Sequence, residues 1–574
     1  MKNEPIRYTV VPAHPAAHRF EISCTVAAPD PSGQRFALPA WIPGSYLIRD
    51  FARNIVAIRA ESGGKPVTLD KIDKHTWQTA ALKQPAALTV VIEVYAWDLS
   101  VRGAHFDETH AFFNGTSVFL RVIGQEDSPC LVDIQPPEGK RFKDWRVATA
   151  LSPERAAGEK GGKAKRHCFG LYRAENYDEL IDHPVEMGHF SHATFDACGV
   201  PHEVVITGRH DCDMSRLTRD LKRICEWQIR FFGEPAPMSR YVFLVTAVGD
   251  GYGGLEHRAS TALLCSRNDL PYAGMTGLPE GYRTFLGLCS HEYFHTWNVK
   301  RIKPAAFTPY DLDRENYTTL LWAFEGFTSY YDDLALLRSG AIERKDWLEL
   351  MAKTLSNVQS TPGRLRQTLA ESSFDAWSKF YRPDENTPNA VVSYYAKGAL
   401  FALTLDLTLR SKTDGRVSLD DIMRALWRRH GKTGIGVGED DIRTIAEECS
   451  GVNLKRLFAE GVSGTRELPL KKLMTVFGVE LSLEAAPTAK APSLGVKTGS
   501  DTNEVKLANV FDGGAAQAAG LSAGDILLAI DGLRVTPATL DKLLARHQPG
   551  DLVRIHAFRR DELMEFTVRL DPPS

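Results

Sequence analysis

The first residues that could do chemistry together are two histidines and a glutamate in the stretch CSHEYFHTWNVKRIKP, residues 289–304. His291 and His295 are four residues apart, so on a helix they share a face and can bind one metal ion through their imidazole nitrogens. Glu292 lies about 100° further round such a helix, where its carboxylate can reach a water on the open side of the ion. Because this HExxH pattern also arises by chance, partner residues are needed elsewhere in the chain.

A catalytic zinc ion needs a third protein ligand and an open fourth position for water. The stretch LLWAFEGFTSYYDDLALL places Glu325 among apolar residues, where a buried carboxylate is costly without a cation or hydrogen bonds. We expect Glu325 to be the third ligand, the alternative being a glutamate on a helix surface. Asp332 is expected to accept the second N–H of a ligating histidine, although Asp333 or plain solvent exposure would fit as well.

These two motifs together resemble the gluzincin aminopeptidases, in which HExxH is followed by a glutamate in a helix. The stretch GGLEH resembles the Gly-x-Met-Glu-Asn strand of that clan. The resemblance implies that Glu256 binds the free α-amino group of a substrate and that Gly253 and Gly254 lie beside the substrate. For Glu256, a surface glutamate at the end of a strand is the alternative.

A further stretch, YYAKG, resembles the Tyr-x-Lys-Gly motif of the same clan. The resemblance implies that Tyr395 stabilises the oxyanion of the reaction, the alternative being a core tyrosine. Twenty-nine residues separate His295 from Glu325, more than in the large aminopeptidases of the clan. That spacing narrows the resemblance to the glycyl aminopeptidase family, zinc metallopeptidases with a C-terminal PDZ domain. Residues 39–55, 177–190 and 464–470 are similar to that family too, so the resemblance covers nearly the whole chain.

The segments that must position these residues predict a multidomain α+β protein. Short runs rich in β-branched and aromatic residues predict an N-terminal β-sandwich over 1–172. By resemblance, 173–345 form a thermolysin-like zinc catalytic domain, and apolar residues at helical spacing predict an α-helical domain over 346–480. After an alanine- and proline-rich boundary, residues 484–574 look like a PDZ domain, whose SLGV stretch would bind a peptide C-terminus. A packing domain with a covered groove is the alternative for this last module.

Composition excludes several other classes of protein. The formal net charge of −3 over 574 residues indicates neither a nucleic-acid nor a membrane-surface partner. No apolar stretch of signal-peptide or membrane-spanning length is found, and the nine cysteines are scattered without CxxC, so we expect reduced thiols and a cytoplasmic location. No GxSxG nucleophile motif occurs, and HGKTG lacks the first glycine of a phosphate-binding loop.

The sequence therefore predicts a zinc-dependent aminopeptidase that acts on peptides with a free N-terminus. In that mechanism Glu292 is the general base, and the family resemblance implies a preference for small N-terminal residues, glycine and alanine. One rival is an endopeptidase with the same zinc chemistry, in which Glu256 points elsewhere. The other is a non-catalytic scaffold that works through its PDZ module, although such a protein has no chemical need for Glu292.

Overall fold

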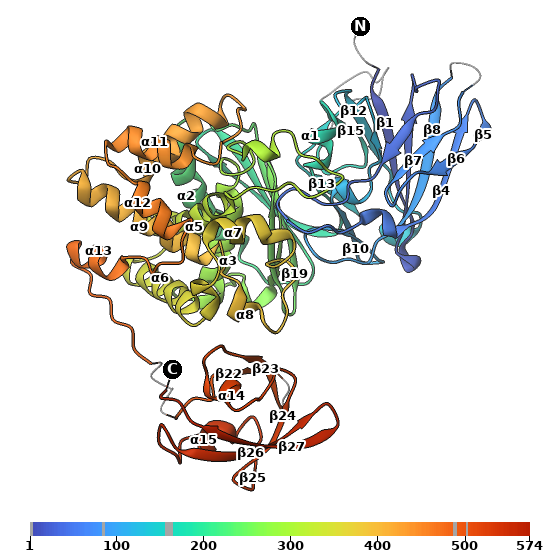
Figure 1. Ribbon diagram of the computed structural model, residues 1–574. Helices are drawn as coiled ribbons and strands as arrows, with labels where there is room; N and C mark the ends of the chain where they lie inside the picture. The colour runs from blue at the N-terminus through green and yellow to red at the C-terminus, as the bar shows by residue number, and fades with distance from the viewer. Residues whose placement is uncertain (1–3, 83–85, 155–164, 486–490, 501–502, 574) are drawn as a thin grey trace. The chain divides into compact units, whose positions relative to one another are not determined.

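The structure is a computed structural model that describes residues 4–82, 86–154, 165–485, 491–500 and 503–573. It divides into two compact units. The first unit contains Met1–Tyr317, Tyr331–Leu348 and Met423–Gly438, and the second contains Thr318–Tyr330, Glu349–Ile422 and Glu439–Ser574. Figure 1 shows the chain coloured from blue at the N-terminus to red at the C-terminus.

The N-terminal part of the first unit is built from three β-sheets, as the runs of β-branched and aromatic residues predict. Buried and less buried residues alternate along its long strands, which is typical of antiparallel sheets with one face on a core. An eight-stranded sheet has the order β14 (Ser152–Pro153), β15 (Gly170–Ala174), β12 (Cys130–Ile134), β1 (Ile6–His14), β2 (Arg19–Val26), β8 (Leu88–Tyr95), β4 (Ile55–Ser62) and β5 (Lys65–Val67).

Two four-stranded sheets complete this β-rich part. One has the order β13 (Arg146–Thr149), β16 (Val185–Gly188), β10 (His110–Phe113) and β9 (Ala104–Phe106). The other has the order β11 (Arg121–Val122), β3 (Arg35–Ala37), β7 (Thr76–Thr79) and β6 (Leu69–Lys71). Because β16 pairs with β10 and β13, the paired β-structure reaches Gly188, past the boundary at 172 that the sequence suggests.

A five-stranded sheet carries the second half of the first unit. Its order is β17 (Phe190–Ala197), β18 (Val200–Thr207), β19 (Tyr241–Val248), β21 (Ser260–Ser266) and β20 (Tyr252–Glu256). The strands β18, β19 and β21 run parallel, while the edge strands β17 and β20 are antiparallel to their neighbours. One hydrophobic core contains Val10 and Phe113 of the N-terminal sheets together with Val242 of this sheet, so burial of apolar surface ties the two parts together.

Three helices accompany this sheet: α1 (Tyr177–Ile181), α2 (Met214–Phe232) and α3 (Glu280–Phe294). The side chain of Asp213 caps α2 by accepting from the Arg216 N–H, and Gly233 ends the helix with a φ of 95°. This agrees with the helix that the apolar spacing and the glycine predict. Helix α3, which bears the HExxH motif, packs against α2, β20 and β21. The motif is thereby held against strand β20, which contains Glu256.

The chain after α3 is mostly helical up to residue 476, as expected. Its helices are α4 (Leu321–Phe324), α5 (Gly326–Arg338), α6 (Arg344–Gln359), α7 (Leu369–Phe374), α8 (Thr387–Ala390), α9 (Ala396–Lys412), α10 (Leu419–Leu426), α11 (Asp441–Ser450), α12 (Lys455–Gly461) and α13 (Leu470–Val476). A π-helical turn, Trp427–Gly431, follows α10 directly. Within the described residues, no helix is long and apolar enough to cross a bilayer.

The C-terminal module has its own sheet and its own hydrophobic core. The sheet order is β22 (Val496–Thr498), β23 (Val505–Val510), β24 (Ile526–Ile530), β26 (Leu552–Arg559) and β27 (Glu562–Arg569), with β25 (Leu533–Arg534) paired to β24. Two short helices, α14 (Ala515–Ala518) and α15 (Leu540–Leu544), complete it. Asp531 and Gly532 both have positive φ, as the tight turn predicted at this Asp-Gly pair requires.

All nine cysteines lie within the described ranges, and none of them is in a disulfide.

Candidate active site

The two histidines of the HExxH motif lie at the end of α3. His291 is in the last turn, His295 is the C-cap residue, and the centroids of their rings are 4.7 Å apart. His291 Nδ1 lies 2.9 Å from Oδ2 of Asp332, and His295 Nδ1 lies 2.6 Å from the carbonyl oxygen of Asn298. Since both partners are acceptors, each Nδ1 donates its proton, and in a neutral ring Nε2 is then the nitrogen that can bind a metal ion.

The contact of His291 distinguishes between the two neighbouring aspartates that the sequence left open. Asp332, on α5, is the residue whose carboxylate meets the imidazole. Burial and the adjacent charge of Asp332 raise the pKa of Asp333 well above its ordinary value. The carboxylate of Asp332 is therefore the partner that fixes the tautomer of His291.

Two further acidic residues lie close to His295. Glu256, at the end of β20, is 3% exposed and Glu292, on α3, is 5% exposed. Their carboxylate oxygens and a ring nitrogen of His295 all lie within 4.8 Å of one another. The burial of Glu256 excludes the alternative of a surface glutamate. Two carboxylates buried together repel each other unless a cation or hydrogen-bond donors offset their charge, so this arrangement suits a cationic ligand.

Glycines allow the backbone to approach both carboxylates closely. A Cβ atom on Gly254 would lie 2.1 Å from Oε1 of Glu292, so only glycine fits beside that carboxylate. Gly44, in the loop after β3, has a φ of 101°, and a Cβ there would lie 2.6 Å from both carboxylate oxygens of Glu256. Gly253 differs, since the nearest atom to its Cβ position is 3.9 Å away. The contact of Gly44 was not expected; its only signal is the Pro-Gly pair in the stretch PAWIPGSYLIRD.

A buried ionic cluster, which we call the Asp182 cluster, anchors the chain just after Glu256. Asp182 accepts from the backbone N–H of Arg258 at 2.9 Å, and its Oδ1 lies 3.3 Å from Nδ1 of His257. The Nζ of Lys300 lies 2.6 Å from the same Oδ1. Burial opposes ionisation of Asp182, but the charges of Lys300 and Arg258 outweigh it and hold the pKa of Asp182 well below its ordinary value.

The Asp182 cluster was not predicted, although its members lie beside predicted motifs. His257 is the last residue of GGLEH, and Lys300 lies five residues after His295 of the HExxH motif. The cluster ties the residues after Glu256 and the residues after His295 to the segment that contains α1. It thus acts as a positioning element for both functional stretches.

Glu325 lies where one helix ends and the next begins in the second unit. Helix α4 ends at Phe324, α5 begins at Gly326, and Glu325 itself is 2% exposed, which excludes a surface position. A Cβ on Gly326 would lie 2.6 Å from Cα of Gly398, so the two glycine-containing motifs meet backbone to backbone. This close approach fixes the start of α5 against α9.

Tyr395 is the N-cap residue of α9, and its side chain is half-buried. Its hydroxyl lies 3.3 Å from the hydroxyl of Tyr381, and the ring of Phe380 stacks on it at a centroid distance of 5.6 Å. Tyr394, by contrast, is fully buried in the core. Of the two adjacent tyrosines, Tyr395 is therefore the more accessible. Tyr381 was not predicted, and no motif marks it.

Comparison with known protein families gives three matches along the chain. Residues 7–189 match the Peptidase M61 N-terminal domain, residues 284–401 match M61 glycyl aminopeptidase, and residues 492–570 match the PDZ domain. The second match contains both the HExxH motif and Glu325. The comparison with curated proteins gave no match.

Among solved structures, the chain is similar to an aminopeptidase N family protein from Idiomarina loihiensis. The identity is 43%, the TM-score is 0.94, and the alignment covers 99% of this chain and 96% of that one. A mutant of an M1 zinc metallopeptidase from Deinococcus radiodurans shares only the fold, with 13% identity, a TM-score of 0.50, and coverage of 82% of this chain and 96% of that one. The α+β fold with an N-terminal β-rich domain, a largely helical catalytic region and a C-terminal PDZ domain is thus confirmed.

The first prediction concerns the space beside Glu292. Gly254→Ala should force the Glu292 carboxylate away and lower kcat/KM for a peptide substrate about 10²-fold, the effect expected of a displacement of about 1 Å in a catalytic site. Gly249→Ala is the matched control, because the Cβ position of Gly249 is 3.6 Å from its nearest neighbour. Equal activity of the two variants would contradict the close approach of Gly254 to Glu292.

The second prediction concerns the Asp182 cluster. Asp182→Asn leaves Lys300 buried without its counter-charge and should lower the free energy of unfolding by about 3–5 kcal/mol at neutral pH. Because the pKa of Asp182 is lower in the folded state, its contribution is complete above about pH 4 and declines as the pH falls through the folded-state pKa. Urea unfolding at several pH values measures this loss.

Asp178→Asn is the control for that measurement, since the Asp178 side chain is 54% exposed in its ion pair with Arg258. An exposed pair contributes at most about 1 kcal/mol, so the two variants should differ clearly. Similar losses for both would show that Asp182 is not the centre of the cluster.

Proposed function

The chain belongs to the M61 glycyl aminopeptidase family, a family of peptidases, and we propose that it is a zinc-dependent aminopeptidase that removes glycine or alanine from peptide N-termini. The observation that carries this proposal is the convergence of two buried carboxylates, Glu256 and Glu292, on His295. One carboxylate can anchor the substrate ammonium while the other acts on water. The preference for small residues is supported by the family description alone.

The ligands in this proposal are His291 and His295 of the HExxH motif and Glu325, which is buried at the junction of α4 and α5. The two histidines fit a zinc ion because their Nδ1 atoms donate to acceptors, which makes Nε2 the nitrogen that can bind a metal in each neutral ring. Two imidazoles and one carboxylate are a common donor set of catalytic zinc. The bound zinc would supply polarisation of the scissile carbonyl and a lowered pKa for water.

The remaining chemistry belongs to side chains of the protein. Glu292 takes a proton from the attacking water and delivers it to the leaving amine. Tyr395 donates a hydrogen bond to the developing oxyanion, an interaction that is strongest in the transition state. Asp332 keeps the ring of His291 in the tautomer and orientation that binding requires.

Glu256 determines where cleavage occurs in this scheme. Its carboxylate lies within 4.8 Å of a carboxylate oxygen of Glu292, so an ammonium bound to Glu256 leaves room for one residue before the reacting carbonyl. Gly44 and Gly254 keep side chains away from the two carboxylates. Gly253 and Gly254 present backbone beside the substrate.

The third prediction tests the base. Glu292→Gln removes the proton acceptor without removing a metal ligand, so it should lower kcat by at least about 10²–10⁴-fold while the protein keeps its zinc. Single-turnover kinetics together with metal analysis of the same sample measure both effects. Normal turnover would exclude Glu292 as the base, and loss of zinc would show that it helps to hold the ion.

The fourth prediction tests the function itself. Alanine or glycine anilide should be hydrolysed in a reaction that a chelator stops and zinc restores, whereas the N-acetylated anilides should be rejected. Glu256→Ala should lower kcat/KM for the free-amine substrate by roughly 10²-fold, because a charge pair of this kind is worth about 2–5 kcal/mol. The acetylated substrate serves as the control within each variant.

Other results of that experiment would identify the rivals. Cleavage of internal bonds in blocked peptides, with unchanged discrimination in Glu256→Ala, would make the protein an endopeptidase. Absence of cleavage by zinc-loaded protein would favour a scaffold that acts through its PDZ domain.

We propose in addition that the PDZ domain binds the C-terminus of a peptide. Its strand β22 is at the end of the sheet and pairs only with β23 among the described strands, which leaves an edge for an added peptide strand. In the adjoining SLGV stretch, Gly495 has a φ of 69° and donates its N–H to the hydroxyl of Ser493. The peptide would therefore be held mainly by the edge of β22.

A further inference from the structure

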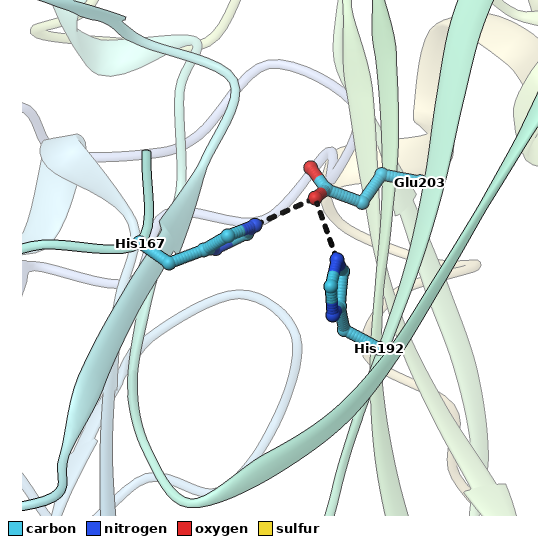
Figure 2. Close-up of side chains that lie close together, drawn as sticks. All are labelled: His167, His192 and Glu203. Atoms are coloured by element: carbon cyan, nitrogen blue, oxygen red, sulfur yellow. Dashed lines mark hydrogen bonds and ion pairs between the residues drawn. The ribbon is translucent and has the colours of Figure 1, made fainter. Parts of the chain in front are cut away.

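A second group of metal-binding side chains lies outside the active site, in the first unit. His167 precedes β15, His192 is on β17, and Glu203 is on β18; Figure 2 shows the three side chains pointing toward one another. His167 Nε2 lies 2.6 Å from Oε1 of Glu203, and His192 Nε2 lies 3.6 Å from the same oxygen. Their ligand atoms all lie within 4.8 Å of one another.

Strand register brings two of these side chains together. In the antiparallel pair β17–β18, His192 is opposite Val205 and Thr194 is opposite Glu203. His192 and Glu203 are therefore diagonal neighbours on one face of the sheet, within reach of long side chains. β17 is an edge strand of this sheet, and the His192 side chain is exposed, so solvent can reach the group.

The third side chain is held by β13 of the N-terminal part. His167 accepts a backbone hydrogen bond from the Val147 N–H at 3.3 Å, and its Nδ1 lies 3.0 Å from the Val147 carbonyl. A carbonyl can only accept, so Nδ1 donates. The backbone bond holds the main chain of His167, and the Nδ1 bond orients the ring so that Nε2 is directed at Glu203.

The two hydrogen bonds of the His167 ring require a cation, either a proton or a metal ion, beside Nε2. Both ring nitrogens of His167 face oxygen atoms, and a neutral imidazole has only one N–H, so a second proton lies between Nε2 and Glu203 unless a metal ion replaces it and moves the two atoms apart. A proton on His167 makes no use of His192, whose nitrogen is beyond hydrogen-bond distance from Glu203. A metal ion would engage all three.

A neighbouring arginine holds the carboxylate of Glu203 in an orientation that suits metal binding. Arg240 donates to Oε2 of Glu203 at 2.6 Å, which fixes the carboxylate and leaves Oε1 toward the histidines.

We propose that His167, His192 and Glu203 bind one divalent transition-metal ion, zinc by the nature of the donors, at a site separate from the active site. Two imidazoles and a carboxylate are zinc ligands, and water completes the coordination on the exposed side of His192. The ion fastens β15 and β13 of the N-terminal part to the edge of the sheet that carries Glu256. Its role is structural, because binding to the folded state alone stabilises that state.

The fifth prediction tests this site with zinc alone. Full-length protein is stripped with a chelator and titrated with Zn²⁺, and zinc per chain is measured together with the Tm. His192→Ala should bind one zinc ion fewer, or bind that ion with an affinity lowered by more than the roughly 10–100-fold that loss of a hydrogen-bond partner of a ligand costs. It should also lose part of the zinc-dependent rise in Tm. Its fold should persist, because Glu203 keeps its contacts with His167 and Arg240.

Two controls make the result specific. His189→Ala removes a nearby exposed histidine and should bind as much zinc as the wild type. His291→Ala disables the proposed catalytic site, and this variant should still lose a zinc ion when His192→Ala is added. The second site is thus tested independently of peptidase activity.

Unchanged zinc binding by His192→Ala would contradict the proposal. If His192→Ala binds the same amount of zinc with the same affinity as the wild type in both backgrounds, a proton on His167 holds the group together and the proposal is wrong. Anilide hydrolysis by zinc-loaded His192→Ala should equal that of the wild type, since His192 contacts none of the proposed catalytic residues.

Discussion

The structure around the site depends on one constraint, the burial of two carboxylates side by side. Glu256 and Glu292 lie almost out of contact with solvent and within a few ångströms of His295. Such a pair is stable only when cations and donors offset its charge, and a substrate ammonium and a metal ion are the cations that an aminopeptidase supplies. In the function that we propose, ligands of the site contact these carboxylates, so binding energy is directed to the atoms that react.

Local patterns predicted the parts of this site that lie within one element. Histidines four residues apart predicted one face of a helix, and the apolar context of Glu325 predicted its burial. The contacts that hold the site together were not predictable, because they join segments far apart in sequence. Gly44 meets Glu256 across more than two hundred residues, and Asp182 meets Lys300 across more than one hundred. No spacing rule connects such pairs.

The N-terminal β-rich part consequently contributes to the candidate active site. Its loop after β3 supplies Gly44 against Glu256, and the indole N–H of Trp41 donates to the carbonyl of Asp311 at 2.8 Å. A backbone bond of 2.8 Å from Ala40 to Leu312 adds to this contact. The long loop that separates HExxH from Glu325 is thus pinned to the N-terminal part, which gives a physical reason for its extra length.

The two groups of histidine and glutamate differ in charge. Around His295 the neighbours are Glu256 and Glu292, so negative charge gathers there, which suits the base and the ammonium anchor that we propose. Around Glu203, Arg240 forms an ion pair with the carboxylate and Arg146 acts on His192, so positive charge accompanies this group. The metal ion that we propose there would tie strands together. Similar ligands can serve different purposes where their surroundings differ.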